Sequence, residues 1–503
     1  MSRINTNVNS LIAQRVLGQN NQGLAGSLER LSTGLRINRG KDDPAGLIAS
    51  QNLRAENASL TSAIKNAERA DQVVNIAEGG LNEVSGLLTE LQGLLTSTAN
   101  DAGLSAEEKE ANQLQIDSIL QTIDRVSAAT SFQGKKLLNG NLDYTTSSID
   151  SNVSGFKVNG AKLGFNETRD VDVLVTQSAQ VGGMVMRFGG TNIDLTDADS
   201  TFTIEVAGNQ GSRELSFSSG TTLSDIAATI NSFTDVTGVT ATASGNDIKL
   251  VSSEYGSDEF VSLKVIDDGG VSGTGVDNFA AADTNALAGS PTAFNALTNG
   301  TTDFGQDVRA TINGIAATTK GTKASINTDF LDVSVDLSTT GATTLGSISA
   351  FTITGGGGDF QLGGRVDIGG KVSLGIGNVA VREIGKTIDG GTNYTLSDIG
   401  SGKTLNVVDG DLSVAQDAVE QAIKDVNSLR GRLGAFQQNT VGATIRSLGV
   451  SLENATAAES AIRDTDFASE TAALTRNQIL SQSATSVLSQ ANAQPQSALA
   501  LLG

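Results

Sequence analysis

The chain has 503 residues and a formal net charge of −21, because 34 Lys and Arg residues stand against 55 Asp and Glu residues. This acidity argues against nucleic acid or an anionic membrane surface as a partner, since both would repel the chain. The sequence contains no Cys, no His and no Trp, which excludes disulfides, thiolate catalysis, Cys- or His-based zinc sites and imidazole bases. We therefore expect no catalytic residue, no cofactor and no metal site.

The charged residues divide the chain into three parts. Residues 1–140 carry 13 basic and 15 acidic side chains, residues 411–503 carry 6 and 9, and residues 141–410 carry 15 and 31. The middle is therefore acidic, whereas both ends are nearly balanced, as surfaces that pack against copies of themselves need to be. The first residues lack the basic-then-apolar layout of a secretory signal. No stretch reaches about 18 apolar residues, so we expect no membrane insertion.

The N-terminal part has the apolar period of helices. Leucines between Leu17 and Leu35 form a short seam, and a seven-residue repeat then continues for about six heptads, with a second apolar set three residues later. At about 1.5 Å per residue, this repeat predicts a rod of roughly 65 Å. Ser105 and Glu108 have the spacing of a capping box, which predicts the start of a third helix. The repeat consists of Leu53, Leu60, Ala67, Val74, Leu81, Leu88 and Leu95.

The middle part changes to a period of two, which is typical of half-buried strands. Residues 201–206, 247–251 and 260–266 are examples, and Gly, Asn and Asp separate such runs. One short helix is expected between strands at residues 224–230, because its apolar residues lie on one face.

The C-terminal part returns to a helical period. Many of its seam positions are Ala, and its polar faces carry Asn, Ser, Gln and Thr, so this end alone would bury little apolar area. Because the chain leaves the N-terminal helices for the middle part and then returns through the C-terminal helices, we expect the two ends to pair antiparallel. We expect neighbouring copies to supply the remaining burial. The seam residues are Val419, Val426 and Leu433, followed in the last helix by Leu480, Ala484, Val487 and Ala491.

These patterns predict an α+β multidomain protein, in which paired helical ends form a coiled coil and a strand-rich middle is inserted between them. The predicted parts are an inner coiled-coil segment with a connecting turn (1–45), a helical rod domain (46–140), an outer domain (141–300) with an insertion module (201–266), a second strand-rich outer domain (301–410), the C-terminal helix of the rod (411–455) and an inner coiled-coil helix (456–503). The residues expected to form the self-assembly seam are Leu53, Leu60, Val74, Leu81, Leu88, Leu95, Val426, Leu433, Leu480 and Val487.

Both ends carry motifs that resemble bacterial flagellin. At the start these are Ile4-Asn5-Thr6-Asn7 and the block from Leu28 to Asp43 (LERLSTGLRINRGKDD), and near the end Ile462 to Ala468 (IRDTDFA). The resemblance covers about 140 residues at the start and about 80–90 at the end, and its motifs are highly specific. Residues 201–266, with the pair Ile230-Asn231, are similar to the small insertion module of flagellins and hook-associated proteins.

The resemblance implies a structural subunit of the extracellular flagellar filament, which serves swimming motility. Flagellins are exported unfolded through the flagellar type III channel and polymerise into a homopolymer beneath a cap. The implied partners are therefore other copies of the chain, an export chaperone that shields the C-terminal helices, the filament cap and the hook-associated proteins. In the filament, the extreme termini form an inner coiled-coil tube, the long helices an outer tube, and the middle faces outward.

The resemblance also implies a vertebrate partner. Some flagellins activate a Toll-like receptor through the second long helix, which aligns with Leu88 to Leu95 of this chain. Leu94 keeps the leucine of that contact, but Glu90 stands where the family usually has a key arginine. Because this reverses the charge at a contact position, we expect weak or absent receptor activation.

Two other classes of function remain open at this point. A hook–filament junction protein would also be helical at both ends, although the tail from Gln490 to Leu502 and the Leu28–Leu47 block favour a filament subunit. An enzyme in the middle region, such as a glycosidase with paired carboxylates, is the third class. No carboxylate pair can be singled out there, and a charged surface explains the Asp and Glu residues more simply.

Overall fold

A computed structural model describes residues 6–100, 103–164, 166–196, 200–280, 287–389 and 392–500. Within these residues the chain forms two compact units. The terminal unit contains the described residues up to Val74, the segment Phe360–Lys371 and the described residues from Leu433 onward. The central unit contains the rest, Asn75–Asp359 and Val372–Arg432.

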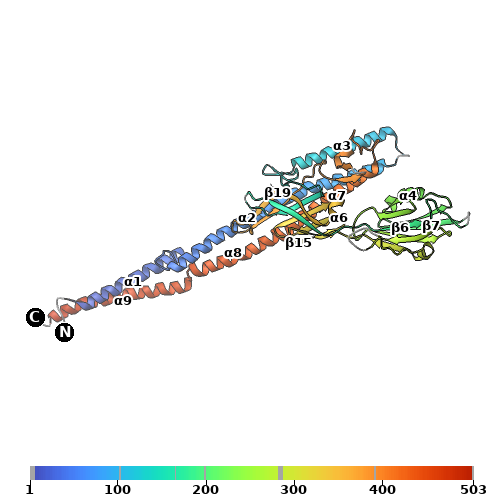
Figure 1. Ribbon diagram of the computed structural model, residues 1–503. Helices are drawn as coiled ribbons and strands as arrows, with labels where there is room; N and C mark the ends of the chain where they lie inside the picture. The colour runs from blue at the N-terminus through green and yellow to red at the C-terminus, as the bar shows by residue number, and fades with distance from the viewer. Residues whose placement is uncertain are drawn as a thin grey trace. The chain divides into compact units, whose positions relative to one another are not determined.

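Helices from both ends of the chain build the terminal unit. Helix α1 (Val8–Thr33) lies beside α9 (Phe467–Ala500), and Figure 1 shows the two running together. Their side-chain contacts join the start of α1 to the end of α9, so the pair is antiparallel, as predicted. Helix α1 begins after Asn7, whose side chain accepts a hydrogen bond from the Ser10 N–H, and is followed by the capping residue Gly34. The φ of Gly34 is 74°, a left-handed conformation that glycine adopts without a steric penalty.

Helix α2 (Pro44–Thr98) has 55 residues and is therefore about 80 Å long. Pro44 occupies its first position, where the missing N–H of proline has no helical partner to lose. The part of α2 in the central unit lies beside α7 (Leu412–Ala435), since Arg430 donates to both Glu78 and Asn82. A single π-helical turn, η4 (Phe436–Val441), connects α7 to α8 (Gly442–Arg463).

Helix α3 (Ala106–Ala129) starts at the predicted capping box. The Ser105 hydroxyl accepts from the Glu108 N–H, and the Glu108 carboxylate accepts from the Ser105 N–H. Together these bonds satisfy two backbone donors that a helix start leaves without partners. The apolar face of α3 is buried, as the helical period indicates, through Ile116, Ile119, Leu120 and Ile123.

Two antiparallel sheets of the central unit enclose one apolar core, and we call this part the host domain. Its strands alternate buried residues with more exposed ones, which are mostly exposed in β5 and half-buried in β18. The first sheet contains, in spatial order, β15 (Ile315–Ala316), β14 (Arg309–Ile312), β5 (Arg169–Gln177), β19 (Gly346–Gly356) and β3 (Tyr144–Ser147). The second contains β16 (Thr318–Lys320), β17 (Lys323–Asn327), β18 (Leu331–Leu337) and β4 (Val153–Ala161).

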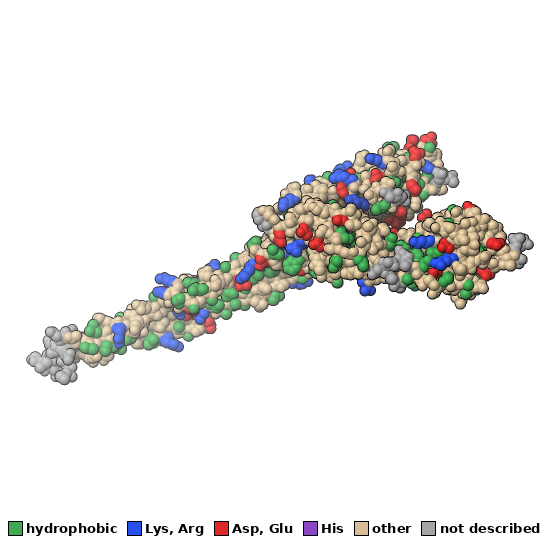
Figure 2. All heavy atoms as spheres, viewed as in Figure 1, with side chains coloured by type: hydrophobic (Ala, Val, Ile, Leu, Met, Phe, Trp, Pro, Cys, Tyr) green, Lys and Arg blue, Asp and Glu red, His purple; other side chains and the backbone are tan. Residues whose placement is uncertain are grey.

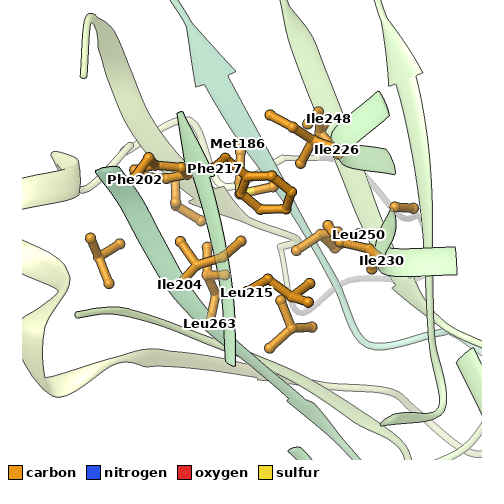
Figure 3. Packing of buried hydrophobic residues seen from close by; sticks show 14 of the residues in the cluster. Met186, Phe202, Ile204, Leu215, Phe217, Ile226, Ile230, Ile248, Leu250 and Leu263 are labelled. Atoms are coloured by element: carbon orange, nitrogen blue, oxygen red, sulfur yellow. The ribbon is translucent and has the colours of Figure 1, made fainter. Parts of the chain in front are cut away.

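Residues 183–304 form a separate sandwich, which we call the inserted module. Figure 3 shows its core, where side chains of both sheets and of helix α4 pack together. One sheet contains, in spatial order, β12 (Gly273–Asn278), β6 (Gly183–Phe188), β10 (Asp247–Ser252) and β9 (Val239–Ser244). The other contains β13 (Thr301–Phe304), β11 (Phe260–Asp267), β7 (Thr201–Gly208) and β8 (Ser212–Ser218). The helical segments are α4 (Leu223–Asn231), α5 (Thr234–Thr237) and η2 (Phe294–Asn299).

The inserted module interrupts the host domain in sequence. Strand β5 lies before the module, but it pairs with β14 and β19, which both follow the module. The predicted domain boundaries stay predictions, whereas the predicted fold class of paired helical ends and a strand-rich middle is confirmed. The remaining short elements are β1 (Ser131–Phe132), β2 (Lys135–Lys136), β20 (Gly358–Gln361), β21 (Lys371–Leu374), β22 (Thr387–Asp389), β23 (Thr392–Tyr394), α6 (Thr339–Thr343) and η3 (Leu396–Ile399).

Candidate assembly surface

The predicted seam residues fall into two groups in the structure. Those of the rod helices are buried, with Leu53 half-buried at the N-terminal end of the repeat. Those of the last helix lie at the surface, where Leu480 is 43% and Val487 is 56% exposed. The buried group consists of Leu60, Val74, Leu81, Leu88 and Leu95 on α2, Val426 on α7, and Leu433 near the end of α7.

Small and polar side chains join α1 to α9. The Asn7 Nδ2 donates to the Ala491 carbonyl at 2.7 Å, and the Ser481 hydroxyl donates to the Asn21 Oδ1 at 2.8 Å. Such bonds fix the register of the pair but add little net stability, because water can replace them. The buried residues of this interface are small: Ser10, Ala13, Ser27, Ala484 and Ala491.

Many of the large apolar side chains of both helices face outward, whereas Leu17, Leu24, Leu31, Leu474 and Leu488 are half-buried. Figure 2 shows hydrophobic side chains at the surface along α1 and α9. Leu11 is 57% and Ile479 is 58% exposed, although full burial of such a side chain is worth about 1.5–3 kcal/mol. The exposed set also includes Val8, Ile12, Val16, Leu28, Phe467, Leu480 and Val487.

A groove of about 630 Å³ runs along the same pair. Ile12 and Val16 line it from α1, and Leu480 and Val487 line it from α9. Its lining also includes amide side chains, such as that of Gln490. A groove lined by apolar and amide side chains is suited to another apolar helix face and offers no charged group for a small ligand.

The two most specific sequence motifs meet at one junction. The Arg36 N–H donates to the Arg463 carbonyl at 2.7 Å, and the Thr465 N–H donates to the Gly34 carbonyl at 3.0 Å. Leu35 and Asp464 form an isolated β-bridge between these bonds. The sequence contained both motifs but no signal that they lie side by side, since they are separated by more than 400 residues.

The turn between α1 and α2 is held by two carboxylates. Asp42 accepts hydrogen bonds from the Arg39 N–H at 2.8 Å and from the Asn38 N–H at 3.2 Å. These bonds, first that of Arg39, hold the pKa of Asp42 below its ordinary value. Asp43 accepts from the Gly46 N–H at 2.8 Å and so satisfies a donor in the first turn of α2.

Within the terminal unit, polar contacts attach α2 to the returning chain. The Asn57 Nδ2 donates to Glu459 of α8 at 2.9 Å, and the Gln437 Nε2 donates to the Asp71 carboxylate at 2.8 Å. Gln437 belongs to the π-helical turn, and such turns often mark functional positions in helices. These contacts are long-range in sequence and were not predicted.

Within the central unit, Arg432 attaches α7 to the host domain. Its guanidinium donates to the Gly375 carbonyl at 2.7 Å and to the Asn159 side chain. Burial lowers the pKa of Arg432, because the charged form loses water. Sequence reasoning missed this residue, since its helical position gives no sign of a partner on a strand.

The two residues expected at the receptor contact lie on α2. Glu90 is exposed, and Leu94 is half-buried.

Across the residues that the structure describes, there is no group of acidic side chains that could hold a metal ion. The helices of the same residues include none that is long and apolar enough to cross a membrane.

The fold and this surface define a class of protein: a structural subunit whose paired helical ends present an apolar face for packing. Comparison with known protein families shows which family of such subunits this is. Residues 4–143 match the bacterial flagellin N-terminal helical region, residues 416–502 match the bacterial flagellin C-terminal helical region, and residues 201–254 match the flagellin hook IN motif. The chain belongs to the bacterial flagellin family.

Full-length relatives agree with the family profiles. The chain is 28% identical to flagellin B of Vibrio cholerae, 27% identical to flagellin B of Helicobacter pylori and 28% identical to flagellin of Salmonella typhimurium. Each similarity covers 99% of this chain and 99% of the relative. The protein is therefore a flagellin, a non-enzymatic structural subunit that polymerises into the extracellular flagellar filament for motility.

Proposed function

We propose that the outward apolar face of α1 and α9 is the surface through which copies of this flagellin pack in the filament. One observation carries the proposal: the pair exposes many of its large apolar side chains, and the residues that it buries fully are Ala and Ser. A helix pair of this kind gains most of its hydrophobic stabilisation only when a further helix covers the face. Polymerisation would then complete the fold of the ends.

The rod seam has a different role in this proposal. Leu81, Leu88 and Leu95 of α2 are already buried inside a single copy. They therefore support the subunit itself and leave the outward face of the terminal helices to make the contacts between subunits.

The test compares two charge substitutions on α9. Val487→Asp places a carboxylate on the apolar face, next to the groove, so we expect seeded polymerisation to be lost while helix content of the monomer stays unchanged. Ser489→Asp is the matched control, because Ser489 is exposed and lies half a helical turn away from Val487. Filament growth of the Val487→Asp chain at the parental rate would contradict the proposal.

The named partners are part of the same proposal. An export chaperone would bind the face around Ile479, Leu480 and Val487, since these side chains are exposed before assembly. Isothermal titration with the family's chaperone should show weaker binding for Leu480→Asp than for Ser489→Asp. Equal affinity of the two variants would mean that the chaperone does not bind the face proposed for assembly. The filament cap and hook-associated proteins would meet the same terminal helices.

The innate receptor is proposed as a weak partner. Glu90 is exposed on α2, so its negative charge would face a receptor that other flagellins meet with an arginine. In a cell reporter assay, purified monomer should activate weakly, and Glu90→Arg should raise the response. Potent activation by the unmodified monomer would contradict this.

A further inference from the structure

Strand β9 is an edge strand of one sheet of the inserted module. The spatial order of that sheet is β12-β6-β10-β9, and Ala241 of β9 lies opposite Leu250 of β10. In an antiparallel pair, alternate residues direct their N–H and C=O groups away from the partner strand. A strand edge of this kind is a template for pairing with a further strand.

Asn231, the last residue of α4, occupies the outer edge of β9. Its Nδ2 donates to the Ala241 carbonyl at 2.9 Å, and the Ala241 N–H donates to its Oδ1 at 2.7 Å. One side-chain amide thus makes the same two bonds that a residue of a neighbouring strand would make. Asn and Gln suit this role, because their side-chain amide carries a donor NH₂ and an acceptor carbonyl side by side, as a peptide group does.

Two threonines cover the preceding outward position. Val239 lies two residues before Ala241, so its backbone groups point the same way. The Thr234 hydroxyl donates to the Val239 carbonyl at 3.1 Å, and the Val239 N–H donates to the Thr237 hydroxyl at 3.3 Å. The α4–α5 segment therefore covers the edge at two successive outward positions.

Ile230 holds the neighbouring Asn231 in place. Its side chain is 1% exposed and packs in the module core, where Figure 3 shows it near Leu250. The adjacent Asn231 lies at the surface, at the end of the same helix. The Ile230-Asn231 pair thus combines an apolar anchor with an amide that reaches the strand edge.

The strand itself carries none of the usual protection against pairing. Residues 239–244 (VTATAS) contain no charged residue and no proline, which are the features that normally blunt an edge. Every copy in a homopolymer carries the same strand, and two antiparallel copies of one edge can pair around a two-fold axis.

From these observations we propose that Asn231 is an edge-capping residue, whose side-chain amide keeps β9 from pairing with β9 of a second copy of the chain.

The test uses unseeded full-length monomer with three substitutions. Asn231→Ala removes both bonds, so amide exchange at Ala241 should accelerate about tenfold, and the chain should dimerise where the parent sediments as a monomer. Asn231→Asp keeps an acceptor for the Ala241 N–H and adds a charge to the edge, so exchange should stay slow and the chain monomeric. Asn209→Ala is the control, because Asn209 bonds Glu259 elsewhere in the module and should change neither readout.

The outcomes separate capping from general stability. Unchanged Ala241 exchange in Asn231→Ala, or faster exchange without dimerisation, overturns the proposal. Amides of the central strand β10 report whether the module stays folded in each variant. If Asn231→Ala unfolds the module, Asn231→Asp decides: slow exchange at Ala241 supports the cap, and fast exchange overturns it.

Discussion

Two helix pairs in this flagellin share one sequence pattern and differ in what they bury. In the central unit, the apolar repeat of α2 is buried within the subunit, as Leu88 shows. In the terminal unit, the repeat of α9 buries only its Ala residues and exposes its larger ones, as Val487 shows. A heptad period therefore indicates that a face will be covered, but whether the same copy or another copy covers it depends on how many elements surround the helix.

The largest expected difference between the two pairs concerns their leucines. Leu88→Ala should lower the free energy of unfolding by about 2–5 kcal/mol, because it leaves a cavity in a fully buried seam. Leu480→Ala should change monomer stability by less than about 0.5 kcal/mol, since the side chain is already exposed. Denaturant unfolding of the monomer measures both, and equal losses would remove the distinction between the pairs.

Polar contacts should show a similar contrast. Gln113 of α3 is buried, donates to the Ile399 carbonyl at 3.0 Å and accepts from the Val407 N–H at 2.8 Å. Gln113→Ala should cost about 1–3 kcal/mol, because it leaves these buried groups without partners.

The matched exposed substitution is Asn20→Ala on α1, whose side chain donates to the Leu480 carbonyl at 3.2 Å. Water can replace that bond, so monomer stability should change by less than about 0.5 kcal/mol. Denaturant unfolding of both variants checks the comparison, and a larger loss for Asn20→Ala would show that α1 and α9 form a tight pair without neighbours.

The smallest effect concerns the turn that leads from α1 into α2. Because the folded pKa of Asp42 lies below its ordinary value of 3.8, its contribution is present above that value and is lost as the pH falls below it. Amide exchange at Asn38 and Arg39, corrected for intrinsic rates, should therefore show protection that decreases on acidification. Asp42→Asn should remove this pH dependence, and an unchanged profile in that variant would exclude Asp42 as its source.

The sequence was sufficient to predict the helical ends, their antiparallel pairing, the capping box at Ser105 and the strand-rich middle. These features follow from local periods and from short-range hydrogen bonds. Sequence periodicity placed Leu81 and Val487 in the same category, because it contains no information on how many neighbours a helix has. The pairing of β5 with strands on the far side of the inserted module was likewise out of reach, since alternation does not specify a partner.

The unpredicted parts of the site depend on single side chains that reach across the fold. Arg432 donates to a strand residue and a loop carbonyl in the host domain, and Asn231 bonds an edge strand. Neither partner lies at a helical or strand spacing from its donor. The meeting of the two motifs at Arg36 and Thr465 is similar, because it follows from the return path of the chain.

Amide hydrogen exchange, measured on the monomer and on the assembled filament, tests the central claim most directly. We predict that amides of α1 and α9 exchange rapidly in the monomer and slowly in the filament, while those of α2 around Leu88 are protected in both states. Equally slow exchange of α1 and α9 in the monomer would contradict the account, because the terminal helices would then be complete without neighbouring copies.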